Sequence, residues 1–481
     1  MAAKNRTGIG AAILAAILSV GAAQAMAAVA VSPPTSVAMH NTVAHKEKHK
    51  TEKAAAADQQ PAGFHKLLDV LAWSYANNPS LLSARAGFRA AEEALPQALS
   101  GWQPSVSGSG NITGESITGS GAANGTTSRQ LGAALTQPLF HGGQTLAAVK
   151  SARASIEAQR ALLRDREQQV LLQAATAYMN VVRDQSLLHV SEKNVTDLDQ
   201  QLKASRGRFK VGDITKTDVS QAEAALAKAQ ADRTAALGNL KTSNAVFEEL
   251  VGFPPGSVGQ PGLPLPIPPT VDDAMDFADR YNPQVVAAAW LQKSSQSDVD
   301  RIFGQRLPQL NLVGGVARNY QPQPGGEPDN TTKTLGLTAT IPLYTGGLLR
   351  SQVRQAKYTA NQRYLDILDT RRQVRESVVG GWETLAATRA EIDSRQAQVK
   401  ASRLALDGIR QETAVGTRTG LDELDTEQTW LSAEVSLVTA RRDEVVAAAM
   451  GLLTPEGLGF PEIAGDEKGP YFLKSPEAPP F

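Results

Sequence analysis

A chain of 481 residues is long enough for two or three ordinary domains, but an aromatic content of only 5% is a poor basis for several compact cores. Its 48 basic and 48 acidic residues balance, which argues against a nucleic-acid-binding protein or a polybasic membrane-surface protein. It contains no cysteine, so disulfides, thiol nucleophiles and cysteine-bound metals are excluded.

The N-terminus has the pattern of a secretory signal. Lys4 and Arg6 precede an apolar run at 9–20, and small residues follow it. We expect a signal peptide at 1–28 and a flexible leader at 29–60, where Ala, Pro, Lys and His occur without periodicity. An uncleaved anchor is the alternative, although the run is shorter than the roughly 18 apolar residues that a spanning helix needs.

The rest of the chain repeats one plan. Prolines and glycines of the first half recur at a constant offset of 204, as in Pro138 and Pro342 (342 − 138) or Gly212 and Gly416 (416 − 212). Chance matching would not keep one offset, so we predict a duplicated structural unit. The expected first repeat, second repeat and Pro-rich tail cover residues 61–260, 261–453 and 454–481.

Each repeat contains two segments that are poor in charge and rich in Gly, Ser and Thr, separated by a loop of small residues. In the last of them Leu335, Leu337 and Ile341 alternate with Gly and Thr, which is typical of a strand between lipid and water. Aromatic residues at the segment ends suggest an interfacial belt, at Trp102, Phe140, Tyr320 and Tyr344. The expected strands lie at about 102–117, 129–140, 306–320 and 332–344.

Long helices are expected after the strands. Apolar residues recur every seven positions as far as Ala177, and the interval resumes four residues out of phase from Val181 to Phe209. This is a stutter in a coiled-coil helix. Val-Gly then ends the helix, and Thr215-x-x-Asp218 resembles a capping box that starts the returning helix. The expected helices, paired as antiparallel coiled coils, lie at about 143–210, 215–251, 347–414 and 419–452.

Four strands cannot close a barrel in a membrane by themselves. Each exposed edge would leave backbone groups without partners in hydrocarbon, so several chains must share one barrel. The smallest barrels have about eight strands, which makes two copies the minimum, and three copies would give about 12 strands.

The junctions and hairpins carry motifs that occur once in each repeat. The sequence reads TQPLFHGG (136–143) and ATIPLYTGG (339–347) at the strand-to-helix junctions, and RFKVGDITKTDVSQAEAAL (208–226) and AVGTRTGLDELDTEQTWL (414–431) at the hairpins. With these motifs repeated at one offset, nearly all of the mature chain resembles the TolC family of outer membrane factors.

This resemblance implies a mainly α-helical protein with a membrane β-barrel part. It implies a homotrimer with a 12-stranded barrel in outer-membrane lipid and a helical tunnel across the periplasm. The trimer would be the exit path of a tripartite efflux pump or a type I secretion system. Its partners would be a periplasmic adaptor and an inner-membrane ABC or proton-driven transporter. No enzyme, cofactor, metal or nucleic-acid partner is expected.

The resemblance also implies a gate at the periplasmic end. Asp422 and Asp425 lie one turn apart where the family has an acidic ring, which would favour cations and raise some pKa values, although Asp422 also fits a helix cap. Arg418 matches a family arginine that ties neighbouring hairpins shut, and Asp218 matches its acidic partner; a solvated arginine is the alternative. Thr413 occupies a position where the family often has an aromatic residue, so one of the contacts that close the family's gate is not expected from this sequence.

The hairpin tips are candidate adaptor contacts, with ordinary turn chemistry as the alternative. The tip residues are Val211, Gly212, Asp213 and Ile214 in the first repeat and Val415, Gly416 and Thr417 in the second. A second hypothesis for the whole chain is a structural or adhesive coiled-coil protein of the cell surface, but a stalk would not need paired strands.

Overall fold

The structure is a computed structural model of the chain, and it describes residues 66–117, 124–256, 258–261, 270–320 and 329–452. The signal peptide, the leader and the Pro-rich tail expected from the sequence lie outside these ranges. Within them, none of the helices combines the length and the apolar character that a membrane span requires.

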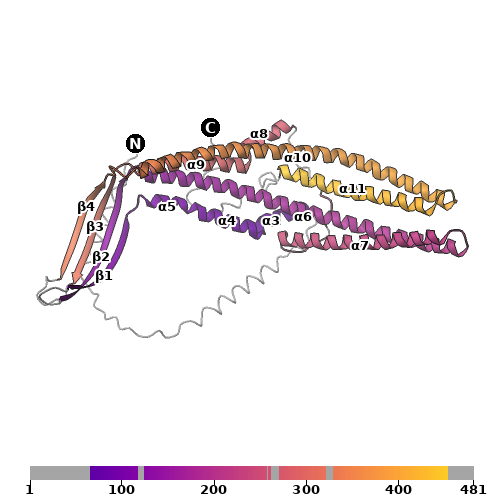
Figure 1. Cartoon of the computed structure of the whole chain (residues 1–481), viewed down its shortest axis with the longest axis horizontal. Coiled ribbons are helices and arrows are strands. Elements are labelled where there is room, and N and C mark those ends of the chain that lie inside the picture. Colours follow the sequence, from indigo (N-terminus) through magenta and orange to yellow (C-terminus); the bar gives the residue numbers. More distant parts are fainter. Residues whose placement is uncertain (1–65, 118–123, 257, 262–269, 321–328, 453–481) are drawn as a thin grey trace. The chain divides into compact units, whose positions relative to one another are not determined.

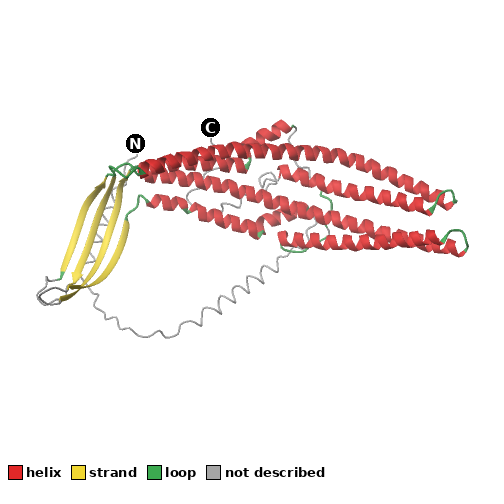
Figure 2. Ribbon diagram, in the orientation of Figure 1, coloured by secondary structure: helices red, strands yellow, loops and turns green. Residues whose placement is uncertain are grey.

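The described chain is mainly helical, and each half places short helices first, then two strands, then a long helix and a returning one (Figure 2). The first half contains α3 (Leu67–Asn77), α4 (Pro79–Glu92), α5 (Ala94–Ser100), β1 (Ser105–Ile117), β2 (Asn124–His141), α6 (Gln144–Lys210) and α7 (Lys216–Val251). The second half contains α8 (Val271–Tyr281), α9 (Pro283–Gly304), β3 (Gln309–Tyr320), β4 (Asn330–Thr340), α10 (Leu348–Ala414) and α11 (Gly420–Leu452). The expected fold class, helical with a strand part, is therefore confirmed.

The strands form one antiparallel sheet in the order β1-β2-β3-β4. The β2–β3 pairing joins the two repeats, and a register shift between Pro138 and Phe140 interrupts it near the end of β2. Strand bounds differ from those expected: β2 begins at Asn124 rather than 129, and β4 ends at Thr340 rather than 344. The difference arises because pairing with a neighbour, rather than composition alone, determines where a strand stops.

Five short helices, α3 to α5 and α8 to α9, were not predicted from the sequence. Asn78 and Asn282 start α4 and α9, where their side chains accept hydrogen bonds from first-turn N–H groups, and a proline follows each of them. Asn-Pro is a helix-start signal of this kind, since asparagine is a favoured N-cap and proline suits the first helical position.

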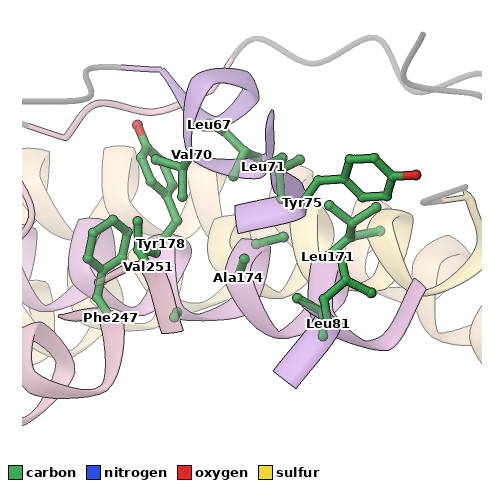
Figure 3. Close-up of a cluster of buried hydrophobic side chains, with 14 of the residues drawn as sticks. Leu67, Val70, Leu71, Tyr75, Leu81, Leu171, Ala174, Tyr178, Phe247 and Val251 are labelled. Carbon is green, nitrogen blue, oxygen red and sulfur yellow. The ribbon is translucent and has the colours of Figure 1, made fainter. Parts of the chain in front are cut away.

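The largest core lies where α3, α4 and α7 pack on α6 (Figure 3). Tyr178 of α6 is fully buried there, and its hydroxyl donates to the carbonyl oxygen of Gly259 at 2.8 Å. Phe247 of α7 and Leu71 of α3 belong to the same cluster of buried side chains. Burial of the tyrosine is possible because its one polar atom has a partner.

The heptad pattern of α6 is confirmed over its first phase and fails at its end. The expected core positions of the first phase and the start of the second are all buried, at Val149, Ile156, Leu163, Val170, Ala177 and Val181. Phe209, the last position of the second phase, is 45% exposed in the single chain, so the pattern does not form a core there. It lies in the last turn of α6, next to the hairpin tip.

Candidate functional site: the sheet and the two hairpins

The sheet has two chemically different faces. Residues directly opposite each other on neighbouring strands share a face, and successive residues alternate between faces. One row across the sheet consists of Val106, Leu135, Gly314 and Leu335, and the next row consists of Ser107, Ala134, Gly315 and Thr334. Val106 and Leu335 are 71% and 73% exposed. The apolar face suits lipid and the face with Ser, Gly and Thr suits water.

The expected aromatic belt is only partly at one end of the strands. Trp102 precedes β1, Phe140 lies near the end of β2 and Tyr344 follows β4, so these three exposed residues mark the end of the sheet that joins the helices. Tyr320 also lies at a strand end, as expected, but at the opposite end of the sheet. It ends β3, which runs away from the helices, and the Arg318 guanidinium lies 4.9 Å from its ring centroid.

The two hairpin tips have the same backbone geometry. Gly212 and Gly416 have φ values of 81° and 80°, and this left-handed conformation strongly favours glycine. In the first turn the N–H of Asp213 donates to the carbonyl oxygen of Arg208 at 3.0 Å, and the second turn has the equivalent bond at 3.0 Å. Such bonds satisfy carbonyls at the helix end and reverse the chain tightly.

The tips themselves are strongly exposed. Val211 and Val415 are 81% and 75% exposed, while Ile214 is half-buried. An apolar side chain held in water at the apex of each hairpin is available to a partner. Arg208 forms a long ion pair with Asp213, at 4.0 Å.

Both returning helices start with the capping box that the sequence predicted. The Thr215 hydroxyl accepts from the N–H of Asp218, and the Asp218 carboxylate accepts from the N–H of Thr215 at 2.8 Å. Thr419 and Asp422 make the same pair of bonds. Backbone and hydroxyl donation from the threonine lowers the pKa of Asp218 and that of Asp422 below the usual aspartate value.

The single chain does not bring the expected gate residues together. The Arg418 Nε donates to the Glu412 Oε2 at 3.2 Å on its own hairpin, while Asp218 is engaged in its cap. Asp425 is exposed on the next turn after Asp422. Thr413 is buried, and its hydroxyl has no hydrogen-bond partner within the described chain.

Reasoning from the sequence missed a repeated ion pair at these hairpins. Arg206 and Glu223 link α6 to α7 at 2.8 Å, and Arg410 and Glu427 link α10 to α11 at 3.3 Å. The separation is 17 residues in both cases (223 − 206 and 427 − 410), and the two pairs differ by the repeat offset of 204 (410 − 206). The equal spacing and the repeat offset could both have been recognised from the sequence alone. In the described ranges, no cluster of His, Cys, Asp and Glu suits a metal ion.

Known proteins match this chain in both repeats. The model of the outer membrane efflux protein family matches residues 73–252 and 277–450. The outer membrane efflux protein BepC of Brucella suis is 32% identical, over 83% of this chain and 88% of that protein. The outer membrane protein TolC of Escherichia coli is 24% identical, over 82% of this chain and 83% of that protein.

A solved structure supports the fold. A membrane protein from Pseudomonas aeruginosa gives a TM-score of 0.71 at 17% identity, over 80% of this chain and 92% of that chain. The resemblance to outer membrane factors is therefore confirmed, the protein is located in the outer membrane, and the family consists of transport channels rather than enzymes. The chain belongs to the outer membrane efflux protein family.

Proposed function

We propose that three copies of this chain form an outer-membrane channel, with a shared barrel of about 12 strands and a helical tunnel beneath it. The observation that carries the proposal is the four-stranded sheet. Its outer strands β1 and β4 each pair on one side only among the described residues, and one of its faces is apolar and exposed. Unpaired backbone groups are not tolerated in hydrocarbon, so the edges are expected to join other copies.

The second long helix supports assembly through the same copies. α10 carries large apolar side chains that the single chain leaves 54–74% exposed, at Leu348, Tyr358, Leu365 and Leu404. Apolar side chains repeated along one helix favour a helical partner. Neighbouring copies of the chain would provide it.

The test is to extract the protein from outer membranes in detergent and to record currents in planar lipid bilayers. We expect a trimer that dissociates on heating before electrophoresis and that conducts ions. Material that stays monomeric and dissolved without detergent would exclude the channel. It would favour the surface coiled-coil hypothesis instead.

We infer that the hairpin end is a gate. In the assembled trimer Arg418 would exchange its own Glu412 for Asp218 of a neighbouring hairpin, so that charge pairs hold the mouth closed reversibly. Replacing Arg418 and Asp218 together with Ala should raise the single-channel conductance. Glu412→Ala is the control, because it frees Arg418 without removing the link. Equal conductance of the double variant and the parent would contradict the gate.

Asp422 and Asp425 would form an acidic ring at this mouth. Asp425 is the sharper test, since Asp422 also caps α11 and its removal would disturb the helix start. Asp425→Ala should weaken the block of conductance by divalent or trivalent cations. The matched control is Gln221→Ala, at the equivalent position of the first repeat (425 − 204). Identical blocking curves for Asp425→Ala and the parent would refute the ring.

The proposal includes a periplasmic adaptor at the tips and an inner-membrane ABC or proton-driven transporter behind it, as part of an efflux pump or a type I secretion system. The exposed Val211 and Val415 support this contact. Because the chain has no cysteine, a Val415→Cys variant carries a single reactive site for cross-linking in whole cells. We expect the adaptor as the cross-linked protein, and a cysteine at the exposed Ala401 of α10, away from the tip, is the control.

A further inference from the structure

A small cavity lined by both polar and apolar side chains lies between the two hairpins of one chain, away from their tips. Its volume is about 60 Å³, and it is lined from α6, α7 and α11 by residues that include Asn194, Leu198, Lys228, Asp232, Glu427 and Gln428. About 10 to 15 Å³ of such space holds one water, so the cavity has room for a few. The hairpins therefore meet here through a contact that leaves room for water.

Glu427 of α11 is the charged residue that this contact buries most. Its side chain is only 4% exposed, and its Oε1 accepts from the Arg410 Nη2 of α10 at 3.3 Å. Arg410 also lies 3.5 Å from Glu423, through its Nε. Both partners belong to the second hairpin, so they stay near Glu427 if the two hairpins separate.

The first repeat contains the same ion pair without the burial. Arg206 and Glu223 correspond to Arg410 and Glu427, yet their side chains are 57% and 46% exposed. The ion pair inside a hairpin therefore does not require a buried glutamate. Glu427 lines the cavity that α11 shares with α6 and α7, so we attribute its burial to the packing of the second hairpin against the first.

The charges that the first hairpin presents near Glu427 are Asp197 of α6 and Lys228 and Asp232 of α7, and Lys193 of α6 lies beside Trp430, one turn further along α11. Lys228 donates to Gln428 at 2.9 Å, and the Nζ of Lys193 lies 5.7 Å from the ring centroid of Trp430. These two lysines link the hairpins through Gln428 and Trp430 rather than through Glu427. Asp197 instead acts on Glu427 as a like charge.

Burial raises the pKa of Glu427 above its ordinary value of 4.5; Arg410 opposes this effect, and Asp197 and Glu423 add to it. Burial and Asp197 come from the first hairpin and are lost if the hairpins separate, whereas Arg410 and Glu423 remain. The pKa is therefore higher in the packed state than in the separated state. By linkage the neutral carboxyl group favours packing, and this contribution is lost as the pH rises through the raised pKa.

We propose that Glu427 is a proton-sensitive contact that seats the second hairpin more firmly against the first when its carboxyl group carries a proton. Release of the proton leaves a charge buried between the hairpins and loosens them. The contact lies within one chain. An effect of this contact on the channel mouth rests on the proposed gate. The contact itself, and its dependence on pH, do not rest on the gate.

The experiment measures the distance between the hairpins by electron paramagnetic resonance. Ala204 of α6 and Ala405 of α10 are exposed, and cysteines placed there can be spin-labelled cleanly because the chain has no other. Labelled chains are diluted with unlabelled chains, so that pairs within one copy dominate. The pH is scanned from about 4 to about 8, which brackets the range of a raised carboxyl pKa.

In the parent we expect a short distance at low pH and a growing long component as the pH rises. The ratio of short to long populations should change about tenfold for each unit by which the two pKa values differ. Glu427→Gln should keep the short distance throughout. Glu223→Gln, the matched control, should follow the parent. The proposal would be overturned if the distance in the parent did not depend on pH, or if the Glu427→Gln variant showed the same pH dependence as the parent. It would also be overturned if the Glu223→Gln variant lost the pH dependence of the parent.

A second variant keeps the test decisive if Glu427→Gln does not fold. Asp197→Asn removes the like charge, so it should move the midpoint of the transition to lower pH, and an unchanged or higher midpoint would contradict the proposal. The distance is read whether or not the protein conducts. A chain that forms no channel but shows the transition would refute the proposed function alone, while a channel with a pH-independent distance would refute only this inference.

Discussion

Helices α6 and α10 occupy the same place in the two repeats, yet the protein buries them very differently. Each has 67 residues, of which 22 are buried in α6 and 9 in α10. α6 packs against α3, α4, α5, α7, α9 and α11, whereas α10 packs against α8, α9 and α11 (Figure 1). The repeat of the sequence plan therefore does not extend to packing: the first long helix is the core of the chain, and the second keeps large apolar side chains exposed.

The largest expected difference between the repeats concerns the glycines at the strand-to-helix junctions. Gly142 and Gly346 both have positive φ values, of 58° and 61°. A Cβ on Gly142 would lie 2.3 Å from the backbone oxygen of Gly304, whereas a Cβ on Gly346 would meet nothing within 4 Å. Gly142→Ala therefore adds a backbone clash to the conformational strain that both substitutions share.

We expect Gly142→Ala to cost about 4 kcal/mol or more, and Gly346→Ala about 1–2 kcal/mol. The measurement is thermal unfolding of the detergent-extracted protein, followed by circular dichroism, together with the amount that reaches the outer membrane. Equal losses for the two variants would show that the close approach at the first junction is not important for folding.

The next largest effect compares a buried leucine of α6 with an exposed leucine of α10, and it separates the stability of the chain from its assembly. Leu171 of α6 is fully buried in the main core, and Leu171→Ala should cost about 2–5 kcal/mol through the cavity it leaves. Leu404 of α10 is 74% exposed in the single chain, so Leu404→Ala should change chain stability by less than about 0.5 kcal/mol. If other copies cover α10, the Leu404 variant should instead yield less trimer.

Size-exclusion chromatography of the solubilised protein, alongside its unfolding curve, distinguishes the two outcomes. A Leu404→Ala protein with the parent's trimer yield would mean that this part of α10 is not an assembly surface. Ala405→Ser, next to it and also exposed, serves as the control for substitution on the same helix.

The smallest expected effect compares the two asparagine caps. Asn78 accepts from the N–H groups of Ser80 and Leu81 and donates to the carbonyl oxygen of Leu250, whereas Asn282 accepts only from Gln284 among the bonds described. Asn78→Ala should therefore cost about 1–2 kcal/mol and Asn282→Ala about 0.5–1 kcal/mol. Unfolding curves of both variants give the two losses in stability. A larger loss of stability for Asn282→Ala than for Asn78→Ala would contradict this prediction.

Several features of this protein were predictable from local sequence. The Gly-ended hairpins and the Thr-x-x-Asp caps were predicted because each rests on one residue's conformational freedom or on a bond spanning three positions. The four strands were predicted because alternation has a period of two, although their ends shifted with pairing. The short helices were missed, even though Asn78-Pro79 and Asn282-Pro283 mark two of their starts.

The sequence by itself determined the repeated unit, the order of its strands and long helices, and the form of its turns, because these depend on neighbours a few residues apart. Only the tertiary structure decided that Glu427 is buried while Glu223 is exposed, that Tyr320 lies at the far end of the sheet, and that α6 rather than α10 is the core. Equivalent positions in the two repeats carry similar residues. Their burial and charge environment are set by packing partners that are distant in sequence.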